Sequence, residues 1–392
     1  MKREICMYTP TTTGGHAIYT LDLLSALAAA NRSRDVAVSL FTCSDLPSRY
    51  RAAGSYLIHD RLPPMRPIRD FSNATLWSCY RQWYFYLRER MFVRLITASQ
   101  HCRAVHFQEY TPWLMRAHFN RLKKVGFRLL YTVHGVYPNR YIDGVPKSVY
   151  HKWCRDGWKR CDALFVHTEG LGQSLRCFLG EDHPPIFVTP SGISGALKCQ
   201  ERPTISILTG DPRQLLFFGV IRPNKGLHIL LQAMHELPEC RLTIAGDFKE
   251  ASYKKRILAE ISLLPKEQVN LIDRFVDDDE IAGIFAMSGL LVLPYTFFFG
   301  QSGVLRLAMQ FGLPVVASDI GGPGESIREW GVGTCVVPND PKALAEGIRR
   351  MMEPKGYESA RNTTEIVRDA LSWEHTAELT WQAYLSILES AV

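Results

Sequence analysis

The sequence predicts an α/β protein of two domains, each a parallel sheet enclosed by helices in a Rossmann-like arrangement, facing each other across a cleft. With 392 residues, the chain exceeds the roughly 250–300 residues at which a single core stops growing. Apolar runs of strand length alternate with segments of helical period. The alternation breaks at residues 190–213, which are rich in Pro, Gly and polar residues, and then restarts. We therefore expect one domain over 1–190 and a second over 191–371.

In the first half, the alternation predicts strands at 3–8, 36–42, 103–108, 127–133, 162–167 and 185–189. The helices expected between them are 16–30, 75–98, 112–123, 148–158 and 169–178. Alternation of this kind builds parallel β-α-β units with helices on both faces of the sheet.

The second half repeats the pattern with strands at 214–219, 241–245, 269–272, 290–294 and 314–317. Its expected helices are 225–236, 251–262, 279–287, 302–311 and 341–352. The last segment, about 372–392, is expected to form a helix that packs back on the first domain. Such folds bind ligands outside the carboxyl ends of their strands, so two facing halves form a binding cleft.

Charge is distributed unevenly along the chain, whose net charge is +7. Residues 61–130 hold 13 Arg and Lys against three acidic residues, and 13 of the 43 aromatic residues. A basic, aromatic region suits nucleic acid, an anionic membrane surface or an anionic ligand. Because no nucleic-acid motif accompanies it, we expect no nucleic-acid partner and favour peripheral contact with an anionic membrane.

Ten cysteines occur without C-x-x-C pairs or metal-ligand spacing, which predicts reduced thiols. The chain starts without an apolar signal region and has no run of about 18 apolar residues. We therefore expect a cytoplasmic protein, peripheral on the inner face of the membrane. The acidic run Asp277–Glu280 resembles a metal-binding D-x-D, but an acidic helix start is favoured, so no metal is expected.

Glycines follow the first strand of each half. Gly14 and Gly15 stand between strand 3–8 and the next helix, where backbone amides can approach a phosphate or sugar; a simple tight turn is the alternative. In FFGVIRPNKGL, strand 214–219 ends at Gly219, and Arg222 and Lys225 precede a helix. A guanidinium fork, an ammonium and a helix N-terminus suit a diphosphate, whereas a solvated loop is the alternative.

A third segment, PYTFFFGQSGV, follows strand 290–294. The backbone amides of Ser302, Gly303 and Val304 are expected at a helix N-terminus, where they point at an anion. Its three phenylalanines predict a pocket lining or a domain contact, since exposed rings on a plain loop are unusual. Residues 319–325 predict another glycine turn before a short helix.

These segments, with LTIAGD, QSGVLRLAMQFGLPVVASDIGG and WEHTAELTWQAY, resemble the donor domain of glycosyltransferase family 4 over about residues 214–390. The first half resembles the family more weakly, through GGHAIYTLDLLSAL, YTVHG and TPSGI. The resemblance implies a GT-B fold, with residues 1–190 on the acceptor side and 191–371 binding a nucleotide-sugar donor. It also implies retention at the anomeric carbon, no required metal and no cofactor besides the donor itself.

The family's phosphate-binding Arg and Lys fall on Arg222 and Lys225. Arg222 is displaced, because many members have Arg directly after the glycine, where Val220 stands here. His134, in YTVHG, matches a family histidine that faces the transferred sugar, although a histidine capping a strand end is the alternative.

The family's paired glutamates fall on Phe299 and Leu307, so both are lost, and with them the usual contacts to the donor sugar and the ribose. Gln301 and Ser302 are our candidates to contact the donor instead. Gln108 and Glu109, after strand 103–108, are candidates for the acceptor side by their position.

The sequence thus predicts a retaining glycosyltransferase that uses a UDP- or GDP-sugar and a glycan, lipid-linked glycan or other glycoconjugate precursor as acceptor. Arg222, Lys225 and helix N-terminal amides are expected to stabilise the departing diphosphate, which takes the acceptor's proton. One alternative is a GT-B nucleotide-sugar epimerase or hydrolase. The missing glutamates motivate another, a catalytically silent nucleotide-sugar-binding protein.

Overall fold

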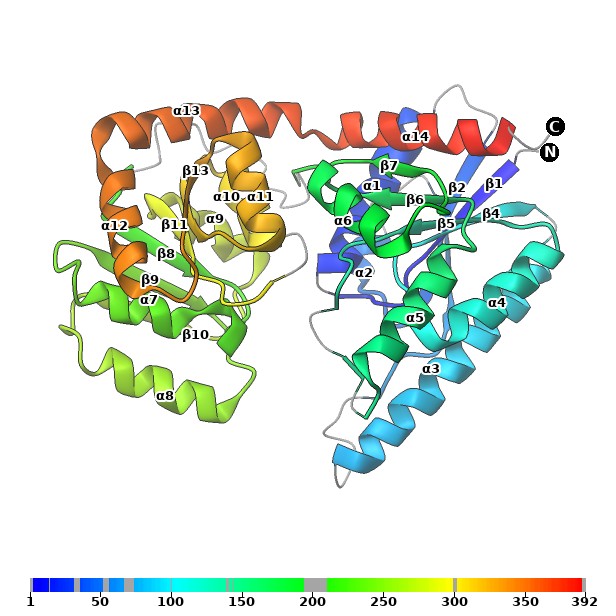
Figure 1. The fold of residues 1–392 in the computed structure, drawn as a ribbon, viewed down its shortest axis with the longest axis horizontal. Helices are drawn as coiled ribbons and strands as arrows, with labels where there is room; N and C mark the ends of the chain where they lie inside the picture. The colour runs from blue at the N-terminus through cyan, green and yellow to red at the C-terminus, as the bar shows by residue number, and fades with distance from the viewer. Residues whose placement is uncertain are drawn as a thin grey trace. The chain divides into compact units, whose positions relative to one another are not determined.

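The computed structural model describes residues 3–13, 15–31, 36–51, 56–66, 74–99, 101–138, 141–142, 144–193, 210–298 and 302–389. The chain divides into two compact units (Figure 1). Unit 1 comprises residues 1–192 and 373–392, and unit 2 comprises residues 193–372. The sequence-based boundary was drawn at residues 190 and 191, with the last helix assigned to the first domain.

Unit 1 is built on a seven-stranded parallel sheet in the order β3-β2-β1-β4-β5-β6-β7. Its strands are β1 (Arg3–Tyr8), β2 (Val36–Cys43), β3 (Leu57–Leu62), β4 (Cys102–Phe107), β5 (Arg128–Thr132), β6 (Ala163–Val166) and β7 (Ile186–Val188). Its helices are α1 (Gly15–Ala30), α2 (Ser48–Arg51), α3 (Ala74–Thr97), α4 (Pro112–Lys124), α5 (Lys147–Trp158), α6 (Glu169–Leu179) and α14 (Trp373–Glu389).

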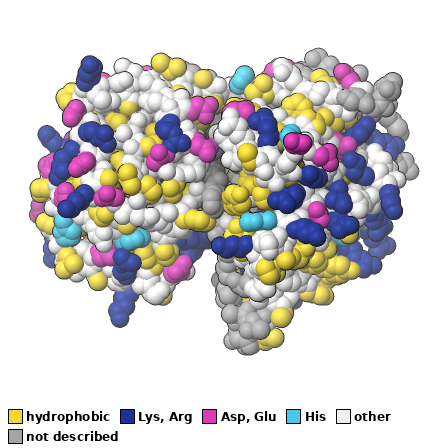
Figure 2. Space-filling model, viewed as in Figure 1, with side chains coloured by type: hydrophobic (Ala, Val, Ile, Leu, Met, Phe, Trp, Pro, Cys, Tyr) yellow, Lys and Arg dark blue, Asp and Glu magenta, His cyan; other side chains and the backbone are white. Residues whose placement is uncertain are grey.

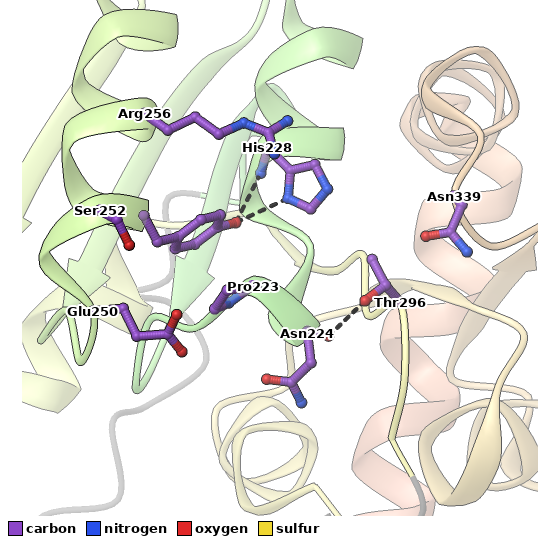
Figure 3. Close-up of a pocket in the computed structure, with 9 residues that line it drawn as sticks. Pro223, Asn224, His228, Glu250, Ser252, Arg256, Thr296 and Asn339 are labelled. Atoms are coloured by element: carbon purple, nitrogen blue, oxygen red, sulfur yellow. Dashed lines mark hydrogen bonds between the residues drawn. The ribbon is translucent and has the colours of Figure 1, made fainter. Parts of the chain in front are cut away.

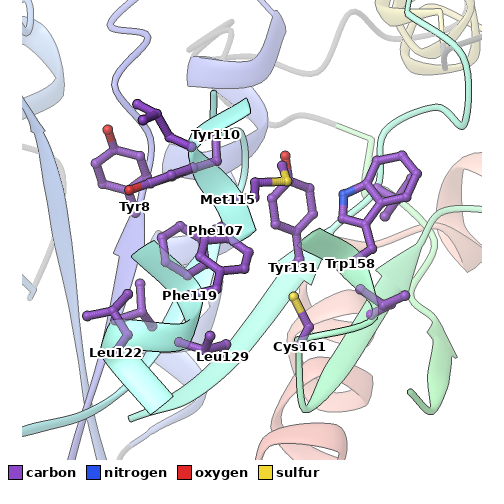
Figure 4. Close-up of a cluster of buried hydrophobic side chains, with 14 of the residues drawn as sticks. Tyr8, Phe107, Tyr110, Met115, Phe119, Leu122, Leu129, Tyr131, Trp158 and Cys161 are labelled. Atoms are coloured by element: carbon purple, nitrogen blue, oxygen red, sulfur yellow. The ribbon is translucent and has the colours of Figure 1, made fainter. Parts of the chain in front are cut away.

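Alternation along β1 explains how this sheet is covered. Cys6 and Tyr8 join an apolar cluster with α3, α4, α5 and α6, and Figure 4 draws part of this cluster. Ile5 and Met7 point to the other face, where α1 and α14 cover them. Successive side chains of a strand face opposite sides, so one apolar strand serves both layers.

Helix α14 is fixed to unit 1 by polar contacts inside this second layer. The indole of Trp381 donates to the Leu27 carbonyl at 3.1 Å, and the Tyr384 hydroxyl lies 2.6 Å from His106 Nδ1. Burial lowers the pKa of His106 to about 3, so the imidazole is neutral in the folded protein. The last helix of the chain therefore packs in the core of unit 1, although it is far from the rest of this unit in the sequence.

Unit 2 has a six-stranded parallel sheet in the order β10-β9-β8-β11-β12-β13. Its strands are β8 (Gln214–Phe218), β9 (Arg241–Gly246), β10 (Val269–Asp273), β11 (Leu290–Leu293), β12 (Val315–Ser318) and β13 (Gly333–Val336). Its helices are α7 (Leu227–Met234), α8 (Ala251–Ile261), α9 (Asp278–Ala286), α10 (Gly303–Gln310), α11 (Gly321–Trp330), α12 (Pro341–Met352) and α13 (Pro354–Ala370). Helices α7, α8 and α12 cover one face, and α9, α10 and α11 the other.

The structure departs from the sequence-based expectation in two predicted segments and in several elements that were not predicted. The helix expected over 225–236 is instead a 3-10 turn at Pro223–Lys225 followed by α7, because Gly226 takes a left-handed φ of 69°. The glycine turn expected over 319–325 lies mostly inside α11, which begins at Gly321. Strands β3 and β13 and helices α2 and α13 were not expected at all.

The basic, aromatic region 61–130 is also less exposed than its composition suggests. Half of its twelve described aromatic residues are buried, among them Phe92, Phe107 and Phe119 in the cluster that contains Tyr8. Trp83 and Tyr86 of α3 remain exposed. None of the helices in the described part of the chain is long and apolar enough to cross a membrane.

Candidate functional site

Both sheets have the doubly wound strand order. Strands are added first toward one edge of the sheet and then toward the other, so the order reverses between two central strands. In unit 2 these are β8 and β11, and in unit 1 they are β1 and β4. Ligands bind outside the carboxyl ends of the strands at such a switch point. The loops after these four strands contain most of the residues that the sequence singled out.

In unit 2, two glycines let the loops after β8 and β11 touch. Gly219 has a φ of 108°, and a Cβ placed on it would lie 3.2 Å from the Val304 side chain at the start of α10. A Cβ on Gly226 would lie 1.7 Å from the Pro294 carbonyl oxygen, which excludes any side chain. Thr296 donates its backbone N–H to the Asn224 carbonyl at 3.0 Å and closes the contact.

Lys225 is placed by aromatic rings from the loop after β11. Its Nζ lies 3.8 Å from the centroid of the Tyr295 ring and 4.0 Å from that of Phe298. The Tyr295 hydroxyl lies 3.2 Å from Ser302 Oγ, at the start of α10. The ammonium is therefore held close to a helix N-terminus. Arg222 is exposed next to it and makes no side-chain hydrogen bond or ion pair with the described residues.

Helix α10 begins where expected, but the Ser302 side chain caps the helix and is not free to make the donor contact that was expected of it. Ser302 is buried and its hydroxyl accepts from the Leu305 N–H at 3.3 Å, which makes it the N-cap. Only its main chain remains to meet a ligand, together with the amides of Gly303 and Val304. Arg306, which the sequence reasoning missed, has a guanidinium nitrogen 4.0 Å from the Cβ position of Gly303.

The other predicted residues of this segment are placed only in part. Leu307, where the family has a glutamate, is half-buried against the apolar layer behind α10. Gln301 and Phe299 lie outside the described residues, as does Gly14 in unit 1. The structure thus brings Gly219, Lys225, Ser302, Gly303 and Val304 together.

A hollow of about 680 Å³ adjoins this turn on unit 2 (Figure 3). Pro223, Asn224 and Thr296 border it, and His228 and Tyr253 line it with Nδ1 and hydroxyl 2.9 Å apart. Burial, and then the nearby Arg256, lower the pKa of His228. A volume of this size falls in the range of roughly 300–1,000 Å³ typical of small-molecule sites.

In unit 1, the loops after β1 and β4 join through Glu109. Its Oε1 accepts from the Thr9 hydroxyl at 3.1 Å and from the Thr11 N–H at 3.2 Å, and its side chain is 30% exposed. Gln108, predicted beside it, is only 1% exposed, and its side-chain amide has no hydrogen-bond partner among the described residues. Glu109 is therefore within reach of a ligand, whereas Gln108 lies behind it.

Three histidines meet at the same edge of this sheet. His134 Nδ1 lies 2.9 Å from His167 Nε2, and the His134 ring stacks on His16 at 4.4 Å. His16 Nδ1 lies 4.0 Å from Glu109 Oε2, so an imidazole row connects His134 to the carboxylate. The sequence reasoning selected only His134. Because His134 and His167 follow adjacent strands, parallel pairing could have linked them.

Gly15 begins α1 in this region, and a Cβ on it would meet no atom within 4 Å. The first turn of α1 is therefore open on that side. In the acidic run, Asp277 caps α9 and the Glu280 carboxylate accepts from the Asp277 N–H at 3.4 Å, which confirms the expected helix start. Among the described residues, no group of three or more His, Cys, Asp or Glu side chains could hold a metal ion.

Comparison with known proteins gives a consistent result along the chain. Residues 13–195 match the model for glycosyltransferase family 4, and residues 201–369 match that for glycosyl transferases group 1. An uncharacterized glycosyltransferase of Methanocaldococcus jannaschii is 22% identical over 97% of each chain. The solved sucrose-phosphate synthase of Thermosynechococcus elongatus aligns with a TM-score of 0.75 at 20% identity, covering 99% of this chain and 100% of the other. The Anabaena protein HepE, solved with UDP-glucose, aligns at 0.68 and 15% identity, covering 98% and 99%.

Proposed function

The chain belongs to the family 4 glycosyltransferases and has their GT-B fold, and we propose that it transfers a sugar from a UDP- or GDP-sugar to an acceptor with retention of anomeric configuration. Unit 2 binds the donor and unit 1 the acceptor in this proposal. No metal or cofactor takes part, because protein cations and helix amides provide the positive charge that the leaving diphosphate requires.

The observation that carries the proposal is the assembly around Lys225 in unit 2. Its ammonium and the N-terminus of α10 lie close together at the switch point, and Gly219 holds the loop after β8 against Val304. The exposed Arg222 begins the same turn as Lys225. Cations and helix amides at one point form an anion site without further groups. Among relatives of the same fold, HepE was solved with UDP-glucose, which supports a nucleoside diphosphate as the ligand.

The reaction follows from this charge distribution. The bond from the anomeric carbon to the β-phosphate oxygen breaks as a bond to the acceptor oxygen forms on the same face of the sugar. The acceptor's proton moves to the departing phosphate oxygen. Arg222 and Lys225 stabilise the charge on the diphosphate, and the family resemblance assigns His134 a role toward the transferred sugar.

On the acceptor side, Glu109 is the group best placed to bind a hydroxyl. Its carboxylate is already ordered by Thr9 and Thr11 and is partly exposed. The acceptor is a glycan, a lipid-linked glycan or another glycoconjugate precursor.

Nucleotide binding tests the donor site first. UDP, GDP, ADP and TDP at millimolar concentration are compared by thermal shift, since a ligand of the folded state raises stability by mass action. One nucleotide should stabilise the wild type and also Arg241→Ala. Arg241 begins β9, at the amino ends of the strands, whereas the proposed site lies at their carboxyl ends. Arg222→Ala should weaken that nucleotide about ten- to hundredfold, because a charged hydrogen bond contributes roughly 1.5–3 kcal/mol.

Absence of stabilisation by every nucleotide, or equal affinity of Arg222→Ala and wild type, would contradict the donor site. With the base identified, donor consumption is followed with and without acceptor, so that hydrolysis and transfer are separated. The anomeric configuration of the product, measured by NMR, tests retention. Unchanged turnover after treatment with EDTA tests metal independence.

We also propose that the outward face of α3 contacts an anionic membrane surface. Leu76, Trp83, Leu87 and Met91 are exposed on it at helical spacing. Burial lowers the pKa of His118 to about 4, and the charges of Arg121 and Arg90 lower it further, so cations from both α3 and α4 lie near His118. Figure 2 shows Lys and Arg side chains gathered over this part of unit 1 beside hydrophobic ones. Apolar side chains flanked by cations are typical of interfacial helices.

Vesicle flotation tests this contact. Wild type should float with vesicles containing phosphatidylglycerol at low salt and less with pure phosphatidylcholine. Trp83→Ser should float less, whereas Leu57→Ser, at an exposed apolar residue of β3, should behave as wild type. Failure of the wild type to float with anionic vesicles at low salt would exclude the contact.

A further inference from the structure

A second hollow, of about 520 Å³, lies entirely within unit 1. It is bordered by α3, by α5 and by the loops after β1 and β4. Its lining includes Thr11 and Glu109 from the two loops and Tyr84 and Arg88 from α3. The candidate acceptor carboxylate and a basic stretch of α3 therefore open into one space, of a size suited to a small ligand.

Arg88 is the most constrained group of this hollow. Its side chain is 9% exposed, and its Nη2 donates to the Glu89 carboxylate at 2.5 Å. Glu89 is fully buried and also accepts from the Tyr8 and Thr111 hydroxyls, at 2.5 and 3.0 Å. Burial alone would lower the pKa of Arg88, but the Glu89 carboxylate more than offsets it, so this pKa lies well above its ordinary value. The guanidinium is thus charged and rigidly oriented.

The Arg88 guanidinium still has donor capacity. Its Nε has no hydrogen-bond partner among the described residues, and the group lines the hollow. The Tyr84 and Phe85 rings lie 5.3 and 5.0 Å from its Cζ and limit the access of water. A buried arginine has five N–H donors in a planar fork that matches the paired oxygens of a phosphate or carboxylate.

A second arginine lies along the same wall. Arg81 is two turns before Arg88 on α3 and lines the same hollow, with its guanidinium 4.8 Å from the Trp77 ring. Two carboxylates, Asp45 and Glu109, line the hollow from the loops after β2 and β4. The hollow is therefore polarised, with cations along α3 and carboxylates on the loops.

We propose that this hollow binds an acceptor carrying an oxyanion, a phosphate or a carboxylate, which Arg81 and Arg88 hold while Glu109 binds an acceptor hydroxyl. The inference rests on the proposed function, since it names the class of acceptor for the same enzyme. In this proposal the hydroxyl of the acceptor, and not its anionic group, lies next to Glu109. A carboxylate repels another anion but accepts a hydrogen bond from a hydroxyl.

The test uses the whole chain and probes of defined charge. Inorganic phosphate, glucose 6-phosphate, glucuronate and glucose are titrated by calorimetry into wild type, Arg81→Gln, Arg88→Lys and Arg103→Gln. Arg88→Lys keeps a charge beside Glu89 but loses the planar fork, which protects the fold. Arg103, exposed near the start of β4, is the matched control.

At least one anionic sugar should bind the wild type at least tenfold more tightly than glucose. Arg81→Gln and Arg88→Lys should each weaken it about tenfold or more, and Arg103→Gln should not. Preference for glucose 6-phosphate identifies phosphate as the oxyanion, and preference for glucuronate identifies carboxylate. Equal binding of glucose, unchanged affinity in both α3 variants, or no binding of any anionic probe overturns the proposal.

The nucleotide titration separates this result from the donor site. All four proteins should bind the stabilising nucleotide alike, because none of these substitutions lies in unit 2. Lost nucleotide binding in the wild type would count against the proposed function, whereas retained nucleotide binding without anion binding counts against the acceptor class alone.

Discussion

Replacing Gly226 by alanine should disrupt the junction on which the donor site depends. The left-handed backbone at this residue costs an L-amino acid roughly 1–2 kcal/mol. The new Cβ would lie 1.7 Å from the Pro294 carbonyl oxygen, so the two loops must separate by more than an ångström. That movement breaks the Thr296 N–H bond to Asn224, which contributes about 1 kcal/mol. We expect about 3 kcal/mol of destabilisation in total.

For a unit of this size, about 3 kcal/mol corresponds to a fall in melting temperature of roughly 6–12 °C, measured by calorimetry. Gly283→Ala is the matched control, because its Cβ meets no atom within 4 Å inside α9 and alanine favours a helix by roughly 1 kcal/mol. Gly226→Ala should also weaken nucleotide binding, since Lys225 moves with the turn. A Gly226→Ala protein as stable as Gly283→Ala would refute the reasoning.

Three further outcomes are expected. Burial lowers the pKa of His106 to about 3, so the unfolded chain binds this proton first and the wild type loses stability as the pH falls from about 6.5 to 3. His106→Asn should reduce this loss. If the free energy of unfolding from urea titrations falls with pH as steeply in the variant as in the wild type, the prediction is wrong. Tyr384→Phe should cost about 1–3 kcal/mol by removing a hydrogen-bond partner of His106, whereas Tyr86→Phe at an exposed ring should cost little. Glu89→Gln should cost about 3–5 kcal/mol in chemical denaturation because it leaves Arg88 buried without its counter-charge, and a loss below 1 kcal/mol would contradict the ion-pair network.

Most of the fold could be predicted because buried parallel strands are nearly continuous apolar runs. The strands that escaped prediction lack this signal. Strand β3 reads LIHDRL, and its charged side chains suit an edge strand that pairs on one side only. Strand β13 has only four residues, GTCV, below the length at which periodicity is informative.

The candidate site could be predicted at the level of loops but not of side-chain roles. Gly219 and Lys225 were selected because a strand precedes them, and the structure places them at one switch point. The role of Ser302 depends on where α10 begins, since one residue decides whether a hydroxyl caps a helix or meets a ligand. Glu89 shows the same limit: its charge is counted in the sequence, but its burial and its hydrogen bonds with Tyr8 and Thr111 are tertiary.

The two switch points share a topology and differ in chemistry, and this difference supports the assignment of donor and acceptor. At the described residues of unit 2, Arg222, Lys225 and the start of α10 provide positive charge. The corresponding loops of unit 1 provide Glu109 and the imidazole of His134. A nucleoside diphosphate is repelled by a carboxylate and attracted by cations, whereas an attacking hydroxyl needs an acceptor for its hydrogen bond. Reversing the roles of the units would place the leaving group against Glu109, so the charges of the loops after the switch-point strands favour the donor on unit 2.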